Sequence, residues 1–322
     1  MKTLVVLVVA LGALAGGHAV AQGWPEQTVR ILVGFPAGTA PDVAARVIAD
    51  KMAPSLGRPV VIENISGASG NIACDKVAKS PPDGYTLVMC GNGSLIAAPA
   101  LYDKIPYDPV KDFTPISRVF VATNILVVHP DVPARTLAEL VALAKAKPGE
   151  LTYGHTGAGT SQHLAGELFK SMAKVDIRPI AYRGTTAILP DLLAGRISIA
   201  FANVVNVTPL VKDGRLRAFA VSSSKRSALV PDLPTLAESG FPGYEAVPWF
   251  GLMAPAGTPQ AIIDRLHAET VKALAFPDAR AALVNQGLDV IGGTPAEFAA
   301  VIKAETPYWA KVIKEAGIRA SE

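Results

Sequence analysis

The sequence predicts an α/β protein of two lobes, each with a doubly wound sheet. Short β-branched strand patterns alternate with helical patterns along most of the chain. Glycine-rich turns follow several of the strands, and about 300 residues follow an N-terminal apolar segment, which is enough for two domains. Half of the residues are hydrophobic and 18% are charged, as expected for a protein with a large core.

The N-terminus has the parts of a secretory signal peptide. Lys2 supplies a positive charge, Leu4–Leu14 is apolar, and Ala19-Val20-Ala21 is an A-x-A cleavage site. We therefore expect export to the periplasm with cleavage after Ala21. The alternative is an uncleaved membrane anchor, but the apolar run is shorter than an ordinary transmembrane span. Gln22 rather than a cysteine follows the cut, so no lipid anchor is expected.

The first part of the chain predicts a βαβαβ order. Its strand patterns lie at Thr28–Val33, Val60–Glu63 and Tyr85–Cys90. Helical patterns lie between them, around Ala44–Ile48 and at Asn71–Lys79. Short connections of this kind predict strands that run parallel in a doubly wound sheet.

A second series of similar units begins at Ile125–His129. Its first helix opens at Thr136, which has Glu139 at the capping-box spacing. Further strands are expected at Leu151–Tyr153, Ile177–Tyr182, Ile197–Phe201 and Leu216–Val221, with helices at Ser161–Met172 and near Ala187–Leu193. A strand near Phe250–Met253 follows, and two long helices are expected to start at Thr258-Pro259 and Thr294-Pro295, with Thr as the cap.

The stretch Leu151–Phe169, LTYGHTGAGTSQHLAGELF, predicts a strand, a glycine-rich turn and a helix start. A helix start offers unpaired N–H groups and a partial positive charge, so such a turn can hold an anion. Gly154 and Gly159 have the spacing of a nucleotide phosphate loop, but Thr160 stands where its lysine would be. Neutral donors suit a carboxylate better. The alternative is a turn that only closes a βα unit.

Similar turns follow other strands, at Gly34–Asp42, Gly91–Ser94 and Arg183–Thr186. Open α/β sheets bind ligands at the carboxyl ends of their strands. We therefore expect the turns of the two lobes to face a cleft that closes around a small molecule.

No catalytic motif is complete, and no enzyme activity is expected. Ser161 and His163 could act as nucleophile and base, but no orienting carboxylate can be assigned. His155 and His163 lack the further ligands that a metal needs, so we expect no cofactor. The net charge is only +3 and the basic residues are scattered, which argues against binding of nucleic acid.

Cys74 and Cys90 are the two cysteines of this exported chain. Their positions permit a disulfide that closes a loop of about 15 residues. The alternative is a pair of small buried side chains. Asp42 is expected to cap the first helix or to contact a ligand through water. Asp191, placed near a helix start, is a candidate acceptor for a ligand amine or hydroxyl.

Several segments together resemble one family. They are VGFPAGTAPDVAAR, VVIENISGASGNIACDKVAKSPPDGYTL, LYDKIPYDPVKDFTPIS, LTYGHTGAGTSQHLAGELF, AYRGTTAILPDLLAGRI and LRAFAVSSSKRSALVPDLPTLAESGFPGYE. The chain resembles the Bug, or TctC-like, receptors, which are the solute-binding proteins of the tripartite tricarboxylate transporter family. The resemblance implies a two-lobed type II periplasmic binding protein fold with the ligand cleft between two doubly wound sheets. We expect lobe 1 to comprise residues 22–123 plus 223–322, lobe 2 residues 124–222, and the signal peptide residues 1–21.

The resemblance also implies an exported, monomeric receptor that delivers a small organic acid or amino-acid-like ligand to a membrane permease. The alternatives are a secreted hydrolase or transferase that uses Ser161 and His163, or a ligand sensor for a signalling partner. Family members hold the carboxylate mainly with main-chain amides, hydroxyls and ordered water. By position, the ligand contacts would be Phe35, Gly38, Thr39, Ala40, Asn92, Thr156, Gly157, Gly159, Thr160, Ser161, His163 and Asp191.

The chain departs from the family in its first turn. Family members usually read F-P-P-G-G-S-T-D, whereas Phe35–Asp42 reads FPAGTAPD, with Thr39, Ala40 and Pro41 at the changed positions. Ala202 also stands where relatives commonly have an aspartate. These departures leave open which acid is bound, including one that is not a simple dicarboxylate.

Overall fold

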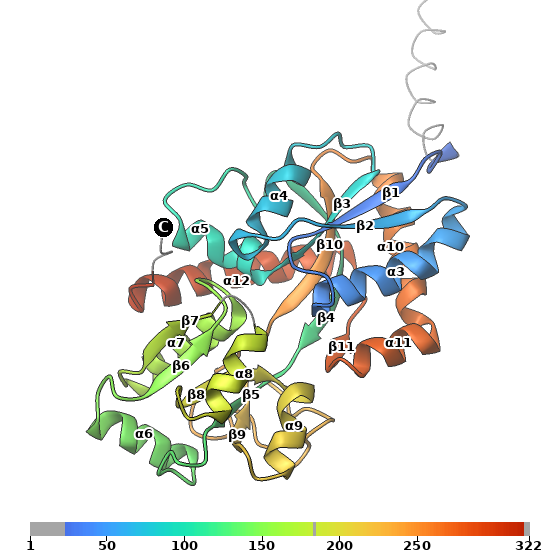
Figure 1. The fold of residues 1–322 in the computed structure, drawn as a ribbon. Helices are drawn as coiled ribbons and strands as arrows, with labels where there is room; N and C mark the ends of the chain where they lie inside the picture. Colours follow the sequence, from blue (N-terminus) through green and yellow to red (C-terminus); the bar gives the residue numbers. More distant parts are fainter. Residues whose placement is uncertain (1–22, 183–184, 319–322) are drawn as a thin grey trace, which may run out of the picture.

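The computed structural model describes residues 23–182 and 185–318 (Figure 1). The signal peptide expected at residues 1–21 lies outside the described residues. So do Arg183 and Gly184 of the turn expected at Arg183–Thr186.

The strands form two sheets, one in each lobe, toward the upper right and the lower left of Figure 1. The first sheet has the order β11-β4-β10-β3-β1-β2, with bounds β1 Val29–Val33, β2 Val60–Asn64, β3 Thr86–Gly91, β4 Phe113–Ala122, β10 Trp249–Pro255 and β11 Leu288–Val290. The second has the order β7-β6-β8-β5-β9, with bounds β5 Asn124–Val128, β6 Thr152–His155, β7 Arg178–Ala181, β8 Ile199–Asn203 and β9 Arg217–Val221. The chain enters the second sheet after β4 and returns to the first at β10.

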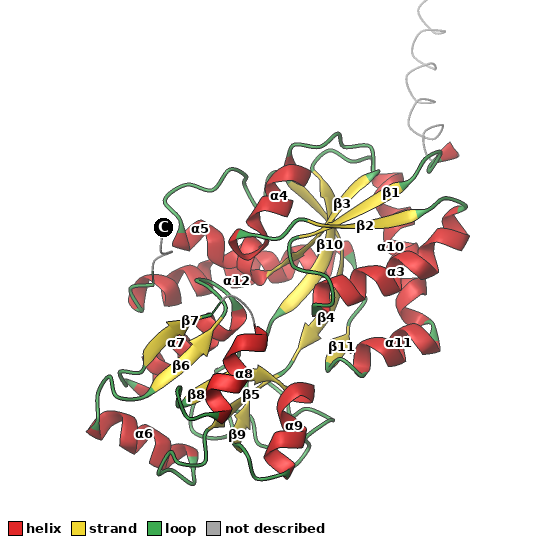
Figure 2. Cartoon of the chain, in the orientation of Figure 1, coloured by secondary structure: helices red, strands yellow, loops and turns green. Residues whose placement is uncertain are grey.

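Helices cover both faces of the larger sheet (Figure 2). The first lobe contains α3 Ala40–Leu56, η1 Ala68–Gly70, α4 Asn71–Ala78, η2 Gly93–Ala97, α5 Ala98–Leu101, α10 Gln260–Ala275, α11 Pro277–Val284 and α12 Pro295–Glu315. The second contains α6 Leu137–Ala146, α7 Ser161–Ala173, α8 Thr185–Leu193 and α9 Val204–Lys212. Ile31 and Val33 of β1 pack in the core formed with α3 and α10, whereas Leu32 packs in the core on the opposite face. Since both faces are covered, the strand is apolar at every position except Arg30, which is only partly buried.

Both sheets are mixed, although the parallel order predicted for the first three strands is confirmed. β1 runs parallel to β2 and β3, as the βαβαβ pattern indicates, but β10 runs antiparallel to both β3 and β4. In the second sheet, β5 is likewise antiparallel to β8 and β9. The antiparallel strands β4, β5, β9 and β10 lie where the chain passes from one lobe to the other. At these points, the chain does not make a βαβ connection within one sheet.

The long C-terminal helix α12 contacts both lobes. It packs against α7 of the second lobe and against β4 and α5 of the first. Phe298, Ile302 and Trp309 of α12 belong to the same hydrophobic core as Leu164 and Phe169 of α7. Helix α7 is therefore held against the first lobe by apolar packing.

Helix α12 begins with the expected capping box. Thr294 Oγ1 accepts from the Glu297 amide at 3.2 Å, and Glu297 Oε2 accepts from the Thr294 amide at 2.8 Å. Helix α10 does not start as expected, since its N-cap is Pro259. The Thr258 hydroxyl instead donates to the Pro255 carbonyl at 2.8 Å, at the end of β10, and so is not available to cap the helix.

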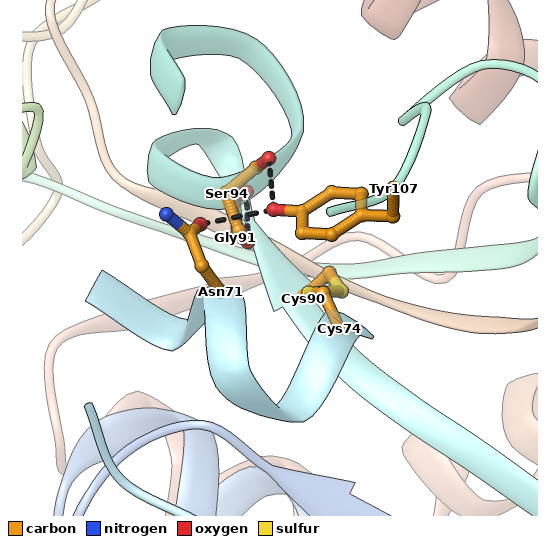
Figure 3. The surroundings of a disulfide bond; sticks show 6 residues. All are labelled: Asn71, Cys74, Cys90, Gly91, Ser94 and Tyr107. Carbon is orange, nitrogen blue, oxygen red and sulfur yellow. Dashed lines mark hydrogen bonds between the residues drawn. A yellow bond between two sulfur atoms is a disulfide. The ribbon is translucent and has the colours of Figure 1, made fainter. Parts of the chain in front are cut away.

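A disulfide joins Cys74 of α4 to Cys90 of β3 (Figure 3). Beside it, the buried Tyr107 hydroxyl lies 2.9 Å from Asn71 Oδ1 and 2.8 Å from the Ser94 carbonyl oxygen. The crosslink and the tyrosine thus fasten the start of α4 to the end of β3 and to η2, which follows it.

Candidate functional site

Loops from the two lobes meet at the carboxyl ends of β2, β3 and β6. The Ser69 hydroxyl of η1 donates across the lobe boundary to the Ala158 carbonyl at 3.3 Å. A Cβ at Gly93 would lie 3.4 Å from the Gly159 carbonyl oxygen and 3.7 Å from that of Ser69. A Cβ at Gly159 would overlap the Leu101 side chain of the first lobe. The loops of the two lobes therefore contact each other in this structure.

The turn between β6 and α7 uses its own amides internally. The Gly157 N–H donates to His155 Nδ1 at 3.2 Å, and the Gly159 N–H donates to His163 Nδ1 at 3.3 Å. Both glycines have positive φ, +131° and +75°. The Thr160 hydroxyl donates to the Gly157 carbonyl at 2.8 Å. Gly157, Gly159 and Thr160, which were predicted to contact a ligand, shape the turn, because the two glycine amides and the Thr160 hydroxyl already have hydrogen-bond partners there.

The two histidine rings lie stacked beneath this turn, with centroids 4.2 Å apart and planes inclined by 14°. His155 is only 7% exposed and His163 only 6%. Burial lowers the pKa of both imidazoles, because it disfavours the charged form. The pKa of His163 falls to about 3, with the charges of His155 and Lys170 adding to the effect of burial. Both rings are neutral at physiological pH.

The N-terminus of α7 opens at the same place. Thr160 is its N-cap, with extended backbone and no side-chain cap, so the amides of the first turn belong to Ser161, Gln162 and His163. No acidic residue lies in that turn. The Thr156 hydroxyl lies 3.1 Å from Gln162 Oε1. This helix end keeps its partial positive charge for an external anion.

The N-terminus of α3, in the first lobe, is already neutralised by the buried Asp42. Its carboxylate accepts from the Gly38 amide at 2.8 Å and also from Arg46 and Asn64. Burial alone would raise the pKa of Asp42, but these hydrogen bonds outweigh it and lower the pKa. The expectation that Asp42 caps the helix is wrong, because the N-cap is Thr39, without a side-chain cap, and Asp42 lies in the first turn and binds the Gly38 amide of the preceding loop.

The remaining donors of this turn are also restricted. The Thr39 hydroxyl donates to the Pro36 carbonyl at 2.7 Å, and Pro41 has no N–H. Ala40, the first residue of α3, keeps a partly exposed position. The α3 end is therefore a weaker anion site than the α7 end.

Phe35 and Asn92 lie on the first-lobe side. The Phe35 ring packs edge-on against Phe250 at 5.3 Å between centroids. A Cβ at Gly70 would lie 3.2 Å from that ring, so Phe35 sits beside η1. Asn92 is buried and donates to the Val247 carbonyl at 3.3 Å, which ties the end of β3 to the segment leading into β10.

Asp191 lies in the last turn of α8, so its placement near a helix start is wrong. The helix begins at Thr185 and contains Pro190 in its interior. Asp191 accepts from the Tyr182 hydroxyl at 2.9 Å and from Arg196 at 2.8 Å. The Arg196 and Tyr182 hydrogen bonds lower the pKa of Asp191. Both contacts are within the second lobe, and neither reaches the β6–α7 turn.

The geometry does not support a catalytic Ser161–His163 pair. His163 Nδ1 accepts the Gly159 amide, and no hydrogen bond joins the ring to the Ser161 hydroxyl in the described structure. Within residues 23–182 and 185–318, no group of three histidine, cysteine or acidic side chains is placed to hold a metal. In the same part of the chain, no helix combines the length and apolar character needed to cross a membrane.

Ser69 makes a contact between the lobes that no sequence pattern indicated. The loop SGASG was recognisable as glycine-rich, and it follows a strand at the ligand-binding edge of the sheet. Ala68 and Ser69 both have positive φ, 45° and 57°. Such strained non-glycine residues cluster at functional sites, which agrees with the position of Ser69 between the lobes.

Residues 44–318 match the model of the tripartite tricarboxylate transporter family receptor, TctC. Several solved structures are similar to the chain over at least 90% of its length, among them the following three. Rpa4515 of R. palustris with adipate is 38% identical, with a TM-score of 0.82 over 92% of this chain and 99% of that one. The periplasmic binding protein BugD is 33% identical, with a TM-score of 0.80 over 92% and 100%. MatC of Rhodopseudomonas palustris with bound malate is 33% identical, with a TM-score of 0.80 over 90% and 100%.

Proposed function

The chain belongs to the tripartite tricarboxylate transporter receptor family, and from this premise we propose that it captures a small carboxylate between its lobes, with the carboxylate at the N-terminus of α7. Members of this family are solute-binding receptors and not enzymes. The similar proteins are described with adipate and with malate, two dicarboxylates of different length. Their shared carboxylate is the chemistry that neutral amide donors can recognise without a fixed cation.

The observation that carries this proposal is the difference between the two helix ends. The α7 end has no acid in its first turn and opens where Ser69 and Gly93 of the other lobe approach. The α3 end already holds the buried Asp42 carboxylate. An anion that enters between the lobes therefore gains more at α7 than at α3.

We assign direct contact with the carboxylate to the first-turn amides of α7 and to the Ser161 hydroxyl. Phe35, Ala40 and Asn92 line the first-lobe side of the site, and Asp191 remains the candidate for the far end of the ligand. Gly38, Thr39, Gly157, Gly159 and Thr160 act by shaping the loops, because their donors are engaged within them. Thr156 contacts Gln162 of α7, and His163, within α7, holds the Gly159 amide of the preceding turn.

We extend the proposal to where the protein is exported and which membrane proteins it serves. After cleavage behind Ala21, the mature chain acts as a periplasmic monomer that passes its ligand to the membrane permease of a tripartite transporter. Its lobes are residues 22–123 with 223–322 and residues 124–222. The descriptions of relatives as periplasmic binding proteins support this location.

The test is calorimetric titration of the exported protein, freed of bound solute, with adipate and malate. Ser161→Pro removes one first-turn amide together with the hydroxyl, yet proline suits the first position of a helix. The backbone of Thr160, with ψ of 158°, is compatible with a following proline, and α11 and α12 already begin with proline. We expect Ser161→Pro to weaken binding about tenfold or more while the fold is kept.

Gln260→Pro is the matched control, because it removes the first-position amide of α10, whose N-terminus lies outside the lobe contacts. It should bind as the unmodified protein does. Equal affinity of Ser161→Pro and Gln260→Pro would disprove the placement of the carboxylate. Failure of the unmodified protein to bind any small acid would disprove the ligand class.

A further inference from the structure

Two buried histidines contact the candidate site only through its backbone. His155 ends β6 and His163 lies in the first turn of α7, on either side of the glycine turn. Each ring accepts one amide of that turn through Nδ1, at 3.2 and 3.3 Å. The turn thus rests on two side-chain acceptors that are stacked on each other.

This arrangement requires both rings to be neutral. A neutral imidazole has one acceptor nitrogen, whereas a protonated imidazole has two donors and no acceptor. Here Nδ1 accepts, so the single proton of each ring is on Nε2. Protonation of either ring would place an Nδ1–H donor opposite the glycine N–H donor, so the hydrogen bond would be lost. Two charged rings with centroids 4.2 Å apart would also repel each other.

The surroundings keep the pair neutral. The nearest titratable groups are Tyr153 of β6, Glu167 and Lys170 of α7, and Tyr244, whose hydroxyl donates to the Ala165 carbonyl at 2.8 Å. Glu167 is the one nearby acid, and it is bound by the Tyr153 hydroxyl at 2.7 Å and by Lys170 at 2.8 Å. Its charge is therefore already compensated.

The turn that these rings hold is the part of the second lobe that meets the first. Between the two bound amides lies Ala158, whose carbonyl accepts from Ser69 of the first lobe at 3.3 Å. Directly after them comes Thr160, the N-cap that sets where the first-turn amides of α7 stand. A shift of the turn would therefore change both the lobe contact and the carboxylate site.

We propose that His155 and His163 are positioning residues, which fix the carboxylate-binding turn by accepting its two glycine amides and do so only as neutral rings. The inference rests on the proposed function, since it concerns the same site. It assigns the histidines no contact with the ligand through their side chains.

Substitutions can separate an acceptor from a space-filling ring. In asparagine, the side-chain oxygen is as many bonds from Cα as Nδ1 is in histidine, and it cannot be protonated. Phenylalanine keeps an aromatic ring of similar size and has no acceptor. His163→Asn and His155→Asn should therefore bind adipate and malate within about threefold of the unmodified protein, whereas His163→Phe and His155→Phe should bind at least about tenfold more weakly.

His129→Phe is the control. His129 Nδ1 accepts the Asp131 amide at 3.2 Å, which is the same kind of bond in another part of the second lobe. This variant should bind normally. If the folded Phe variants at 155 and 163 bind as tightly as His129→Phe, the inference is wrong. If the unmodified protein itself binds neither acid, the proposed function fails instead.

A second measurement needs neither ligand nor variant. Nitrogen NMR of labelled histidine in the unmodified protein reports which ring nitrogen carries the proton. We expect two rings with bare Nδ1 and protonated Nε2 at neutral pH, and both rings should take up a proton at lower pH than ordinary histidines, which titrate between about pH 8 and about pH 5. Protonation on Nδ1, or ordinary titration of both rings, would overturn the inference even if the Phe variants do not fold.

Discussion

Asp42 shows how one buried carboxylate determines the properties of a loop at the residue scale. It is 1% exposed and bound to a backbone amide, a guanidinium and an amide side chain. These partners order Gly38 and the loop before α3, and they cancel the charge that would otherwise attract an anion there. The same residue therefore stabilises the first lobe and directs the ligand toward the second.

We predict that Asp42→Asn lowers the free energy of unfolding by about 1–3 kcal/mol at neutral pH, because a buried hydrogen-bonded charge is lost and Arg46 then faces an amide N–H₂ group. The pKa of Asp42 is lowered in the folded state, so its contribution is fully present above the unfolded-state pKa. It is lost as the pH falls through the lower, folded-state pKa. The difference between variant and unmodified protein should therefore shrink below about pH 4.

Urea unfolding at several pH values measures this difference. Asp278→Asn is the control, since Asp278 lies in the first turn of α11 and pairs with Lys51 but is largely exposed. It should change the unfolding free energy much less than Asp42→Asn does, because an exposed ion pair is screened by solvent. An Asp42→Asn variant as stable as Asp278→Asn, or a difference that grows in acid, would contradict the prediction.

At this scale the sequence could locate the turns but not the partners of their amides. The glycine-rich pattern predicted an anion-binding turn, and the family resemblance placed Gly157 and Gly159 among the ligand contacts. The structure gives both amides to histidine rings, which depends on the packing of His155 beneath His163. Side-chain packing of this kind carries no pattern along the chain, so only the three-dimensional arrangement reveals it.

At the element scale, strands with a clear apolar pattern were predicted well. β1, β2, β3 and β5 lie within a few residues of their expected positions. β4, Phe113–Ala122, was not predicted, because Pro115, Ser117 and Arg118 interrupt its pattern, and proline is poorly suited to a sheet interior. β11 has only three residues, too few for a period to show. Both lie on the side of the sheet away from β1, where pairing comes from distant parts of the chain.

The crosslink between α4 and β3 gives an element-scale prediction. Cys74 and Cys90 are separated by 16 positions, so the disulfide restricts a short loop of the unfolded chain. We predict that the double variant Cys74→Ala/Cys90→Ala loses about 3 kcal/mol of unfolding free energy. Because Tyr107 still holds Asn71 and η2, the fold and the start of η2 should be retained.

Equilibrium unfolding with and without a thiol reductant provides the measurement and its control. Reduction should destabilise the unmodified protein by a similar amount and leave the double variant unchanged. A double variant within about 1 kcal/mol of the oxidised protein would show that the crosslink adds little, which the loop-closure argument does not allow.

For the whole molecule, the two-lobed α/β class followed from alternating patterns, whereas the mixed direction of the sheets did not. Local patterns define a βαβ unit, but β10 pairs with β3 after the chain has passed through the other lobe. The bridging position of α12 is equally non-local, since its apolar face contacts helix α7 from far earlier in the chain. Contacts between distant segments, and not local propensity, therefore set how the lobes meet.

The lobe contact at Ser69 provides a prediction for the molecule as a whole. The Ser69 hydroxyl reaches the Ala158 carbonyl only when the lobes are closed, so Ser69→Ala destabilises the closed form alone. The loss of one hydrogen bond, about 1 kcal/mol, should weaken adipate or malate binding about fivefold and leave the unfolding free energy nearly unchanged. Small-angle X-ray scattering should show a larger radius of gyration for the ligand-free variant if the unmodified protein is partly closed without ligand.

Ser66→Ala changes an exposed serine of the same loop and should have neither effect. If Ser69→Ala binds as tightly as Ser66→Ala, the hydroxyl does not stabilise closure, and the lobes are held together by the apolar contact of α12 with α7.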